Sequence, residues 1–173
     1  MKRLLAALPL LALAALAAVF LGFSLRRDPD FKPDALVGRP VPTIALPTLA
    51  GEPPAPLSAA VQGPTYVNLF ASWCAPCEYE HPQLVALSRS GARVVGVAYK
   101  DDPVKTRAFL QRLSNPFAAI LVDREGRAGV ELGVTGVPET YLVGADGVIL
   151  AKHAGPLTPE IVADLERKRL AGR

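Results

Sequence analysis

The sequence has few of the residues on which special architectures depend. Its 173 residues include two Cys, two His, one Met and one Trp, and only 6% are aromatic. Two cysteines are too few for a miniprotein stapled by several disulfides. Long apolar runs are also scarce, since only one exists and it is N-terminal, which excludes a multi-span membrane protein. An apolar content of 50% excludes a disordered chain.

Charge of one sign is scarce beyond the first 25 residues. Lys2 and Arg3 are the only charged residues of that segment, so the other 148 residues carry 17 Lys and Arg against 16 Asp and Glu. A balance this close to neutral gives no electrostatic basis for nucleic-acid binding. The same residues are numerous enough to form one domain with its own core.

The apolar surplus lies between Leu4 and Leu25, which bound 22 residues without a charge. As a helix, such a run spans roughly 33 Å, about the thickness of the bilayer core. We therefore predict a transmembrane anchor over residues 1–25, with the N-terminus inside because of Lys2 and Arg3. A cleaved export signal and a buried core helix stay open as alternatives. An anchor or a signal would place the rest of the chain in an oxidising compartment.

Prolines punctuate the polar segment 26–42, which we interpret as a tether that leads to one domain over residues 43–173. In that domain, apolar runs rich in strand formers alternate with stretches that begin at helix caps. This alternation predicts an α/β fold with a central mixed sheet flanked by helices. The predicted strands are 43–46, 65–71, 93–99, 117–122, 139–143 and 148–153, the predicted turn is 51–56, and the predicted helices are 77–90 (interrupted at Pro82), 103–113, 124–132 and one that begins after Thr158.

Both cysteines lie in Trp73-Cys74-Ala75-Pro76-Cys77, directly after a predicted strand and at the start of a predicted helix. Unpaired N–H groups and the positive end of the helix dipole stabilise a thiolate there. One helical turn separates the cysteines, so the second sulfur can reach the first. We therefore predict a redox dithiol with Cys74 as the exposed attacking thiol and Cys77 as the shielded resolving thiol. Trp73 would cover one side of the pair and form a docking surface.

Other uses of the cysteine pair stay open on the residues alone. A structural disulfide with this spacing closes too short a loop to stabilise the fold much. Zinc needs four ligands, for which only His81 and His153 could join the cysteines. Haem attachment requires a histidine directly after the second cysteine, where the sequence has Glu78. Copper delivery could use the two cysteines with one histidine.

The cysteine motif resembles the active site of the thioredoxin superfamily. Val137-Pro138, some 60 residues later, resembles the cis-proline loop of that superfamily, and Pro82 resembles the proline that kinks its active-site helix. The resemblance implies a thioredoxin-like fold in which Pro138 is cis and lies against the dithiol. It also implies that the backbone of Val137 is free to pair with an extended peptide substrate.

Segments 96–102, 136–140 and 153–155 resemble the DsbE/CcmG thiol:disulfide interchange proteins of cytochrome c maturation, a likeness that covers about residues 35–170. The resemblance implies a single-pass protein of the cell inner membrane with its domain in the periplasm. Its substrates would be apocytochrome c or haem-ligation partner thiol proteins, and a DsbD/CcdA-type membrane thiol transporter would donate electrons. The redox-active disulfide would serve without a cofactor or metal. Alternatives are a TlpA/ResA-like general thiol reductant and a copper metallochaperone.

The same resemblance assigns Glu80 and Glu139 to the active site, while Asn68 stands where many thioredoxins carry a buried Asp. Negative charge near a thiolate raises the thiol pKa and, by disfavouring the reduced form, lowers the reduction potential. We therefore expect a Cys74 pKa of about 7 or above and a dithiol that acts as a reductant.

More ordinary roles stay open for several polar residues. Glu80 and Glu139 could be solvated surface carboxylates, and we expect His81 on a helix surface and His153 at a strand end. Residues 99–102 could end a strand and cap the next helix, or they could line a substrate groove.

Overall fold

The computed structural model describes residues 12–22 and 36–171, which belong to two separate compact units. The first unit holds a helix over residues 12–22 with exposed side chains. Within the described ranges, no helix has the length and apolar character needed to cross a membrane. Most of the predicted anchor and tether, residues 1–11 and 23–35, lies outside the described residues. The anchor therefore stays a prediction.

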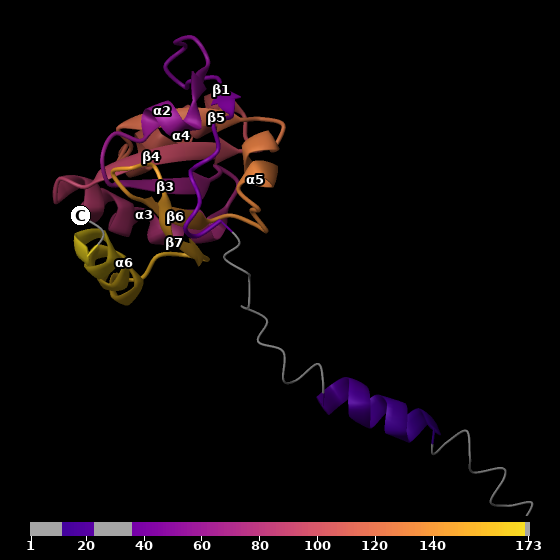
Figure 1. Ribbon diagram of the computed structural model, residues 1–173. Helices are drawn as coiled ribbons and strands as arrows, with labels where there is room; N and C mark the ends of the chain where they lie inside the picture. Colours follow the sequence, from indigo (N-terminus) through magenta and orange to yellow (C-terminus); the bar gives the residue numbers. More distant parts are fainter. Residues whose placement is uncertain (1–11, 23–35, 172–173) are drawn as a thin grey trace, which may run out of the picture. The chain divides into compact units, whose positions relative to one another are not determined.

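The second unit is built on a five-stranded mixed sheet with the strand order β5-β4-β3-β6-β7 (Figure 1). Strands β3, β4 and β5 are parallel, while β6 is antiparallel to β3 and β7 is antiparallel to β6. Parallel neighbours need a crossover connection, and helices follow β3 and β4 for that reason. The strands are β3 (Thr65–Phe70), β4 (Arg93–Tyr99), β5 (Ala119–Asp123), β6 (Glu139–Val143) and β7 (Ile149–Ala154).

Helices cover both faces of this sheet and produce two core clusters. Side chains alternate along a strand, so Tyr66 and Phe70 of β3 enter one cluster while Val67 and Leu69 enter the other. One face is covered by α3 (Ala75–Arg89), α4 (Pro103–Leu113) and α6 (Pro159–Ala171), and the other by α2 (Leu57–Ala60) and α5 (Arg127–Glu131). The expected mixed sheet flanked by helices is confirmed.

The segment before β3 forms a small hairpin that the sequence did not predict. Strand β1 (Ala45–Leu46) pairs with β2 (Ala55–Pro56), and β2 lies in the segment 51–56 that we interpreted as a turn. Of the predicted strand 43–46, only the second half, residues 45–46, forms a β-strand. Two-residue strands carry too little pattern for a periodicity argument to detect.

The domain also includes residues that we placed in the tether. The Gly38 N–H donates to the Ile149 carbonyl at 2.8 Å, and the Val41 N–H donates to the Gly147 carbonyl at 2.9 Å. Val41 is 4% exposed and packs in the core. The chain therefore joins the hairpin of β6 and β7 before residue 43, because its backbone finds hydrogen-bond partners there.

Strands β4 and β6 and helix α4 have the predicted bounds, whereas several other boundaries differ from the prediction by one to three residues. Helix α3 begins at Ala75 rather than Cys77, because Pro76 fits the first helical turn. It continues through Pro82, where we expected an interruption, since later residues of α3 still pack on the sheet and compensate for the lost hydrogen bond. Strand β5 begins two residues later than predicted, and α5 is shorter than the predicted helix 124–132.

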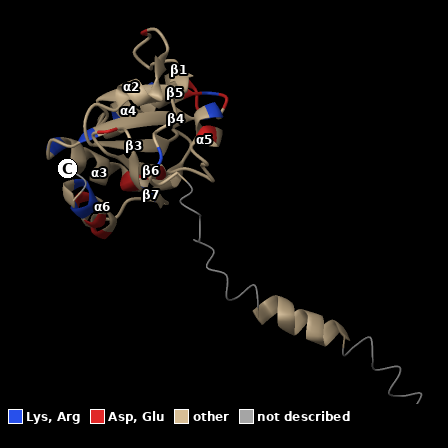
Figure 2. Cartoon of the chain, viewed as in Figure 1, with Lys and Arg blue, Asp and Glu red and all other residues tan. Residues whose placement is uncertain are grey.

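Charges of both signs are interspersed over the domain surface (Figure 2). On α6, Arg167 and Lys168 pair with Asp164 at 2.9 and 3.0 Å, and Arg169 pairs with Glu166 at 2.7 Å. The two pairs on Asp164 are exposed and contribute little to stability, whereas the Arg169–Glu166 pair is partly buried.

Candidate active site

The dithiol lies where β3 ends and α3 begins. Cys74 is the N-cap residue of α3, and its Sγ accepts the Cys77 N–H at 3.2 Å. The two cysteines form a disulfide, with Cα atoms 5.3 Å apart. Pro76 occupies the first turn, where its missing N–H costs nothing. After reduction, the helix N-terminus would therefore stabilise the Cys74 thiolate.

Both cysteines are more buried than the sequence suggested. Cys74 is 4% exposed and Cys77 is 1% exposed, so our expectation of an exposed Cys74 is wrong in degree, although Cys74 is the more accessible of the two. The cause is the neighbouring loop, since the Cys74 Sγ lies 3.6 Å from the Val137 carbonyl oxygen. Only a partner that approaches closely can therefore reach this sulfur.

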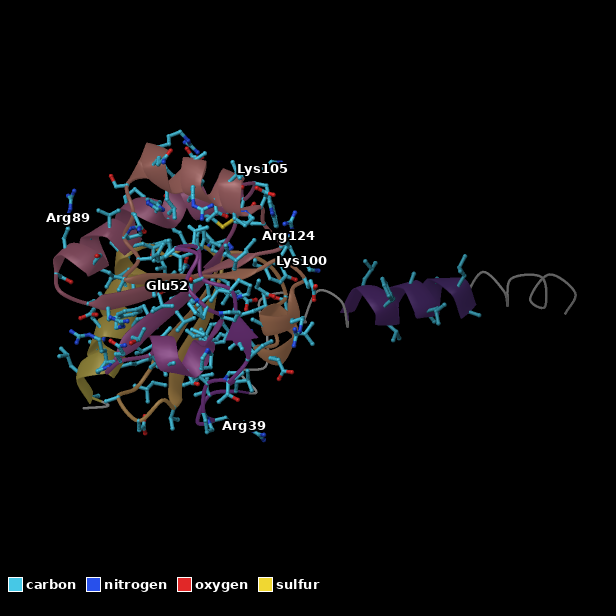
Figure 3. The ribbon with its side chains drawn as sticks, turned by 90° about the horizontal axis from the view of Figure 1, so that it is seen from above. Arg39, Glu52, Arg89, Lys100, Lys105 and Arg124 are labelled. Carbon is cyan, nitrogen blue, oxygen red and sulfur yellow. A yellow bond between two sulfur atoms is a disulfide. The ribbon has the colours of Figure 1, made fainter. Side chains whose placement is uncertain are left out.

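Trp73 forms an exposed surface beside the disulfide, with 59% of the residue accessible. Its indole N–H donates to the Lys100 carbonyl at 3.2 Å, which fixes the ring against the end of β4. Lys100 holds a left-handed backbone with φ of 47° at this contact. In the view of Figure 3, the disulfide lies at the same end of the domain as the labelled Lys100 and Arg124. Trp73 is therefore exposed next to the disulfide, and its role as a docking surface stays a prediction.

The Val137–Pro138 peptide bond is cis, as the resemblance implied. Pro138 is buried and Val137 is half-buried beside the dithiol. The Pro138 carbonyl accepts the Gly155 N–H at 2.9 Å, which attaches the loop to the end of β7. The cis-proline and the cysteine pair, 61 residues apart in the sequence, therefore meet at one site.

Asp101 organises the segment that precedes the dithiol. This buried carboxylate accepts the Ser72 N–H and hydroxyl at 2.7 Å each, the Thr106 hydroxyl at 2.8 Å and the Asp102 N–H at 2.8 Å. Asp102 in turn caps α4. Residues 99–102 therefore end a strand and cap a helix, and they also hold the active-site loop, which sequence reasoning did not anticipate.

Glu80 is fully buried, so the solvated alternative is wrong for it. Its carboxylate accepts the Asn68 amide at 2.8 Å and the Leu157 N–H at 2.8 Å. Burial raises the pKa of Glu80 to about 7, although the hydrogen bonds from Leu157 and Asn68 oppose this shift. Glu80 follows Cys77 by one helical turn and can exchange a proton near neutral pH.

Glu139 is also buried, at 1% exposure, and lies in a dense set of donors. One carboxylate oxygen accepts the Thr135 N–H at 3.0 Å and hydroxyl at 2.8 Å, and the other lies 3.0 Å from the Lys152 Nζ and 3.1 Å from the Tyr141 hydroxyl. Burial raises the pKa of Glu139, but the hydrogen bonds from Thr135 and Lys152 outweigh it and hold the pKa below its ordinary value.

Sequence reasoning missed Lys152, which changes the expected electrostatics. We expected Glu139 to add negative charge beside the dithiol, yet the Lys152 ammonium lies 3.0 Å from its carboxylate and opposes that charge. Tyr141 opposes Lys152 in the sheet, so Glu139 is the diagonal neighbour of the lysine. The sequence does show a lysine on the strand that follows Glu139, and this position could have indicated that the two residues pair.

The two histidines do not join the cysteines. His81 is 3% exposed, so the predicted helix-surface position is wrong, and its Nε2 lies 2.7 Å from the Ser114 carbonyl with its ring edge-on to Phe109. Burial lowers the pKa of His81. His153 lies in β7 opposite Thr140. Among the residues that the structure describes, no three His, Cys, Asp or Glu cluster as metal ligands.

Comparison with known proteins gives the same picture. The family model described as Redoxin matches residues 36–168. Thiol:disulfide interchange protein DsbE of Escherichia coli strain K12 is 41% identical over 169 residues, which cover 93% of this chain and 90% of that protein. Thiol:disulfide interchange protein HelX of Rhodobacter capsulatus is 37% identical over 166 residues, with 95% and 94% covered.

Solved structures agree with the sequence relatives. A crystal structure from Chlorobium tepidum, described as a thiol:disulfide interchange protein DsbE, superposes with a TM-score of 0.66 at 29% identity and covers 79% of this chain and 96% of that chain. The fold, the Cys74–Cys77 pair and these relatives lead to one assignment. The chain belongs to the Redoxin family, among the DsbE/HelX thiol:disulfide interchange proteins, and is a thiol–disulfide oxidoreductase.

Proposed function

We propose that the protein is a periplasmic reductant, anchored in the inner membrane by residues 1–25, that acts in cytochrome c maturation. Its clients are disulfides of apocytochrome c or of haem-ligation partner thiol proteins. The observation that carries the proposal is the Cys74 Sγ at a helix N-terminus, 3.6 Å from the Val137 carbonyl of a cis-proline loop. The identity to DsbE and HelX supports the client class.

In the proposed reaction, the reduced protein gives two electrons to a client disulfide. The Cys74 thiolate attacks one client sulfur, the client S–S bond breaks, and the other client sulfur leaves as a thiolate that takes a proton. Cys77 then loses its proton and attacks the Cys74 Sγ, which breaks the mixed disulfide and releases the second client thiol. We assign Glu80 as the acceptor of the Cys77 proton, because burial places the pKa of Glu80 at about 7.

Three further residues shape the site in this proposal. Trp73 supplies an exposed face against which the client packs. The cis bond at Pro138 presents the backbone of Val137 to an extended client segment next to the sulfur. A DsbD/CcdA-type membrane thiol transporter then reduces the Cys74–Cys77 disulfide and returns the protein to its active form.

The decisive test is to trap the clients. With Cys77→Ser in the full-length protein, the mixed disulfide on Cys74 cannot be resolved, so clients accumulate as covalent adducts that mass spectrometry identifies. We expect apocytochrome c or haem-ligation partners among them, and none with Cys74→Ser as the control. Adducts with many unrelated exported proteins would favour a general reductant of the TlpA/ResA type. Tight Cu(I) binding by the reduced protein without any adduct would favour a copper metallochaperone.

A further inference from the structure

Lys152 is a buried cation that takes no part in the electron and proton transfers of the proposed exchange reaction. Its side chain is 6% exposed, although it lies on the edge strand β7. The ammonium lies 3.0 Å from Glu139 Oε2, donates to the Gly133 carbonyl at 3.0 Å and lies 5.3 Å from the centroid of the Tyr141 ring. Lysine is almost never buried unless it is paired, so these contacts are specific interactions that compensate for the burial of its charge.

These contacts hold the loop that leads from α5 to β6 at several points. The Lys152 ammonium binds the loop backbone at Gly133, near its start. The Tyr141 hydroxyl donates to the Leu132 carbonyl at 2.8 Å. Glu139, at the end of the loop, accepts both donors of Thr135 near the middle. The Lys152–Glu139 ion pair therefore binds this loop at Gly133 and at Thr135.

The same loop carries the group that faces the attacking sulfur. Val137 lies between Thr135 and Glu139, and its carbonyl oxygen is 3.6 Å from the Cys74 Sγ. A displacement of the loop would move this carbonyl relative to the sulfur. Removal of the Lys152 ammonium would release the Gly133 carbonyl and leave the buried Glu139 carboxylate without its cation.

We infer that Lys152 is a positioning residue which, through Glu139, sets the cis-proline loop and thereby favours disulfides in peptide chains over small disulfides. The inference rests on the proposed function, because it concerns how the same site selects its clients. A peptide chain can pair with the Val137 backbone as it reaches Cys74, whereas a small disulfide needs only the sulfur. The position of the loop therefore matters more for the first class of substrate than for the second.

The test compares two substrates with the reduced full-length protein. One is a peptide with an intramolecular disulfide, and the other is 2-hydroxyethyl disulfide, which is neutral and has no peptide backbone. Lys152→Met should lower the second-order rate constant for the peptide, divided by that for 2-hydroxyethyl disulfide, by about tenfold, because a displaced loop hinders only the substrate that pairs with it. Lys152→Arg keeps the charge and should restore most of the ratio. Lys168→Met, which removes an exposed ion pair on α6, is the matched control and should keep the wild-type ratio.

Each outcome decides the inference. Equal losses on both substrates, or an unchanged ratio, would show that Lys152 only stabilises the fold and would overturn its positioning role. If Lys152→Met does not fold, the double variant Glu139→Gln with Lys152→Gln takes its place in the comparison, because this variant leaves no uncompensated charge. A lowered ratio in that variant supports the inference, and a wild-type ratio overturns it. A wild-type protein that reduces neither substrate would instead overturn the proposed function.

Discussion

Glu80 shows how a single residue couples the fold to the chemistry. Its carboxylate connects the active-site helix α3 to β3 through Asn68 and to the segment before α6 through Leu157. Both contacts favour the ionised form, but full burial outweighs them and raises the pKa to about 7. The protein therefore keeps a group that titrates near neutral pH one helical turn after Cys77, and this burial costs stability as the pH rises above the ordinary glutamate pKa of about 4.5.

The contribution of Glu80 to the stability of the domain should fall as the pH rises from about 4.5 to about 7. In this range the unfolded chain has released the Glu80 proton and the folded protein still holds it, so the folded state binds more protons. The raised pKa corresponds to about 3 kcal/mol, which is lost by pH 8. Urea unfolding of wild type and Glu80→Gln from pH 4 to 8 measures this.

The free energy of unfolding of Glu80→Gln, minus that of wild type, should increase as the pH rises from 4 to 8. Glutamine keeps an oxygen for the Leu157 N–H and carries no charge to bury. A difference between the two proteins that does not change with pH would contradict the raised pKa of Glu80.

The reduction potential offers a second view of the same residue. We expect wild type to be more reducing than about −180 mV, the potential of protein disulfide isomerase. Glu80→Gln should raise the potential at pH 8 by some tens of millivolts, since the ionised carboxylate disfavours the nearby thiolate. At pH 6 the shift should be smaller, because Glu80 is then mostly protonated. Equilibration with glutathione gives both values, and an equal shift at both pH values would exclude a charge effect.

At the scale of elements, the dithiol depends on the ends of β3 and β4 and on the loops that follow these two strands. The carboxyl ends of parallel β3 and β4 lie at one edge of the sheet, which brings Trp73 beside Lys100. Asp101 adds a side-chain link between the loop after β3 and the start of α4. The dithiol thus lies at the start of α3, and Asp101, which follows the neighbouring strand β4, holds the loop before this helix in place.

Asp101→Asn should lower the free energy of unfolding by about 2 kcal/mol, because the new amide group cannot accept all of the donors that the carboxylate satisfies. The loop that carries the dithiol should also move, so disulfide reduction should slow. Asp102→Ala, which removes the cap of α4 and an exposed ion pair with Arg124, is the control and should cost about 1 kcal/mol without slowing reduction. Equal effects of the two variants on the rate would refute a role of Asp101 at the dithiol.

At the scale of the whole molecule, we propose that the N-terminal segment holds this chemistry at a membrane. The full chain should remain in the membrane fraction after an alkaline carbonate wash, since 22 uncharged residues can span the bilayer core. A variant without residues 1–25 that keeps an export signal should appear in the soluble periplasmic fraction and still reduce disulfides. If cells that express the full-length protein instead yield a shorter, cleaved product in the soluble fraction, the segment is an export signal rather than an anchor.

The sequence alone determined the α/β alternation, the dithiol at a strand-to-helix junction and, through the resemblance, the cis bond at Pro138. These features depend on local patterns: strand runs, helix caps and a motif that requires a particular backbone. The hairpin of β1 and β2 escaped prediction because two-residue strands carry no periodicity. The attachment of residues 38–41 escaped it because those hydrogen bonds join segments more than 100 residues apart.

Only the tertiary structure decided the state of the polar residues around the dithiol. The sequence could not tell a buried glutamate from a solvated one, since burial depends on which helices cover the sheet. It placed His81 at the surface, whereas packing against Phe109 buries the ring. It also left Lys152 unnoticed, because the partner of a lysine is set by strand register across the sheet. Local pattern therefore gives the position of the reactive sulfurs, and long-range packing gives the charges and pKa values that act on them.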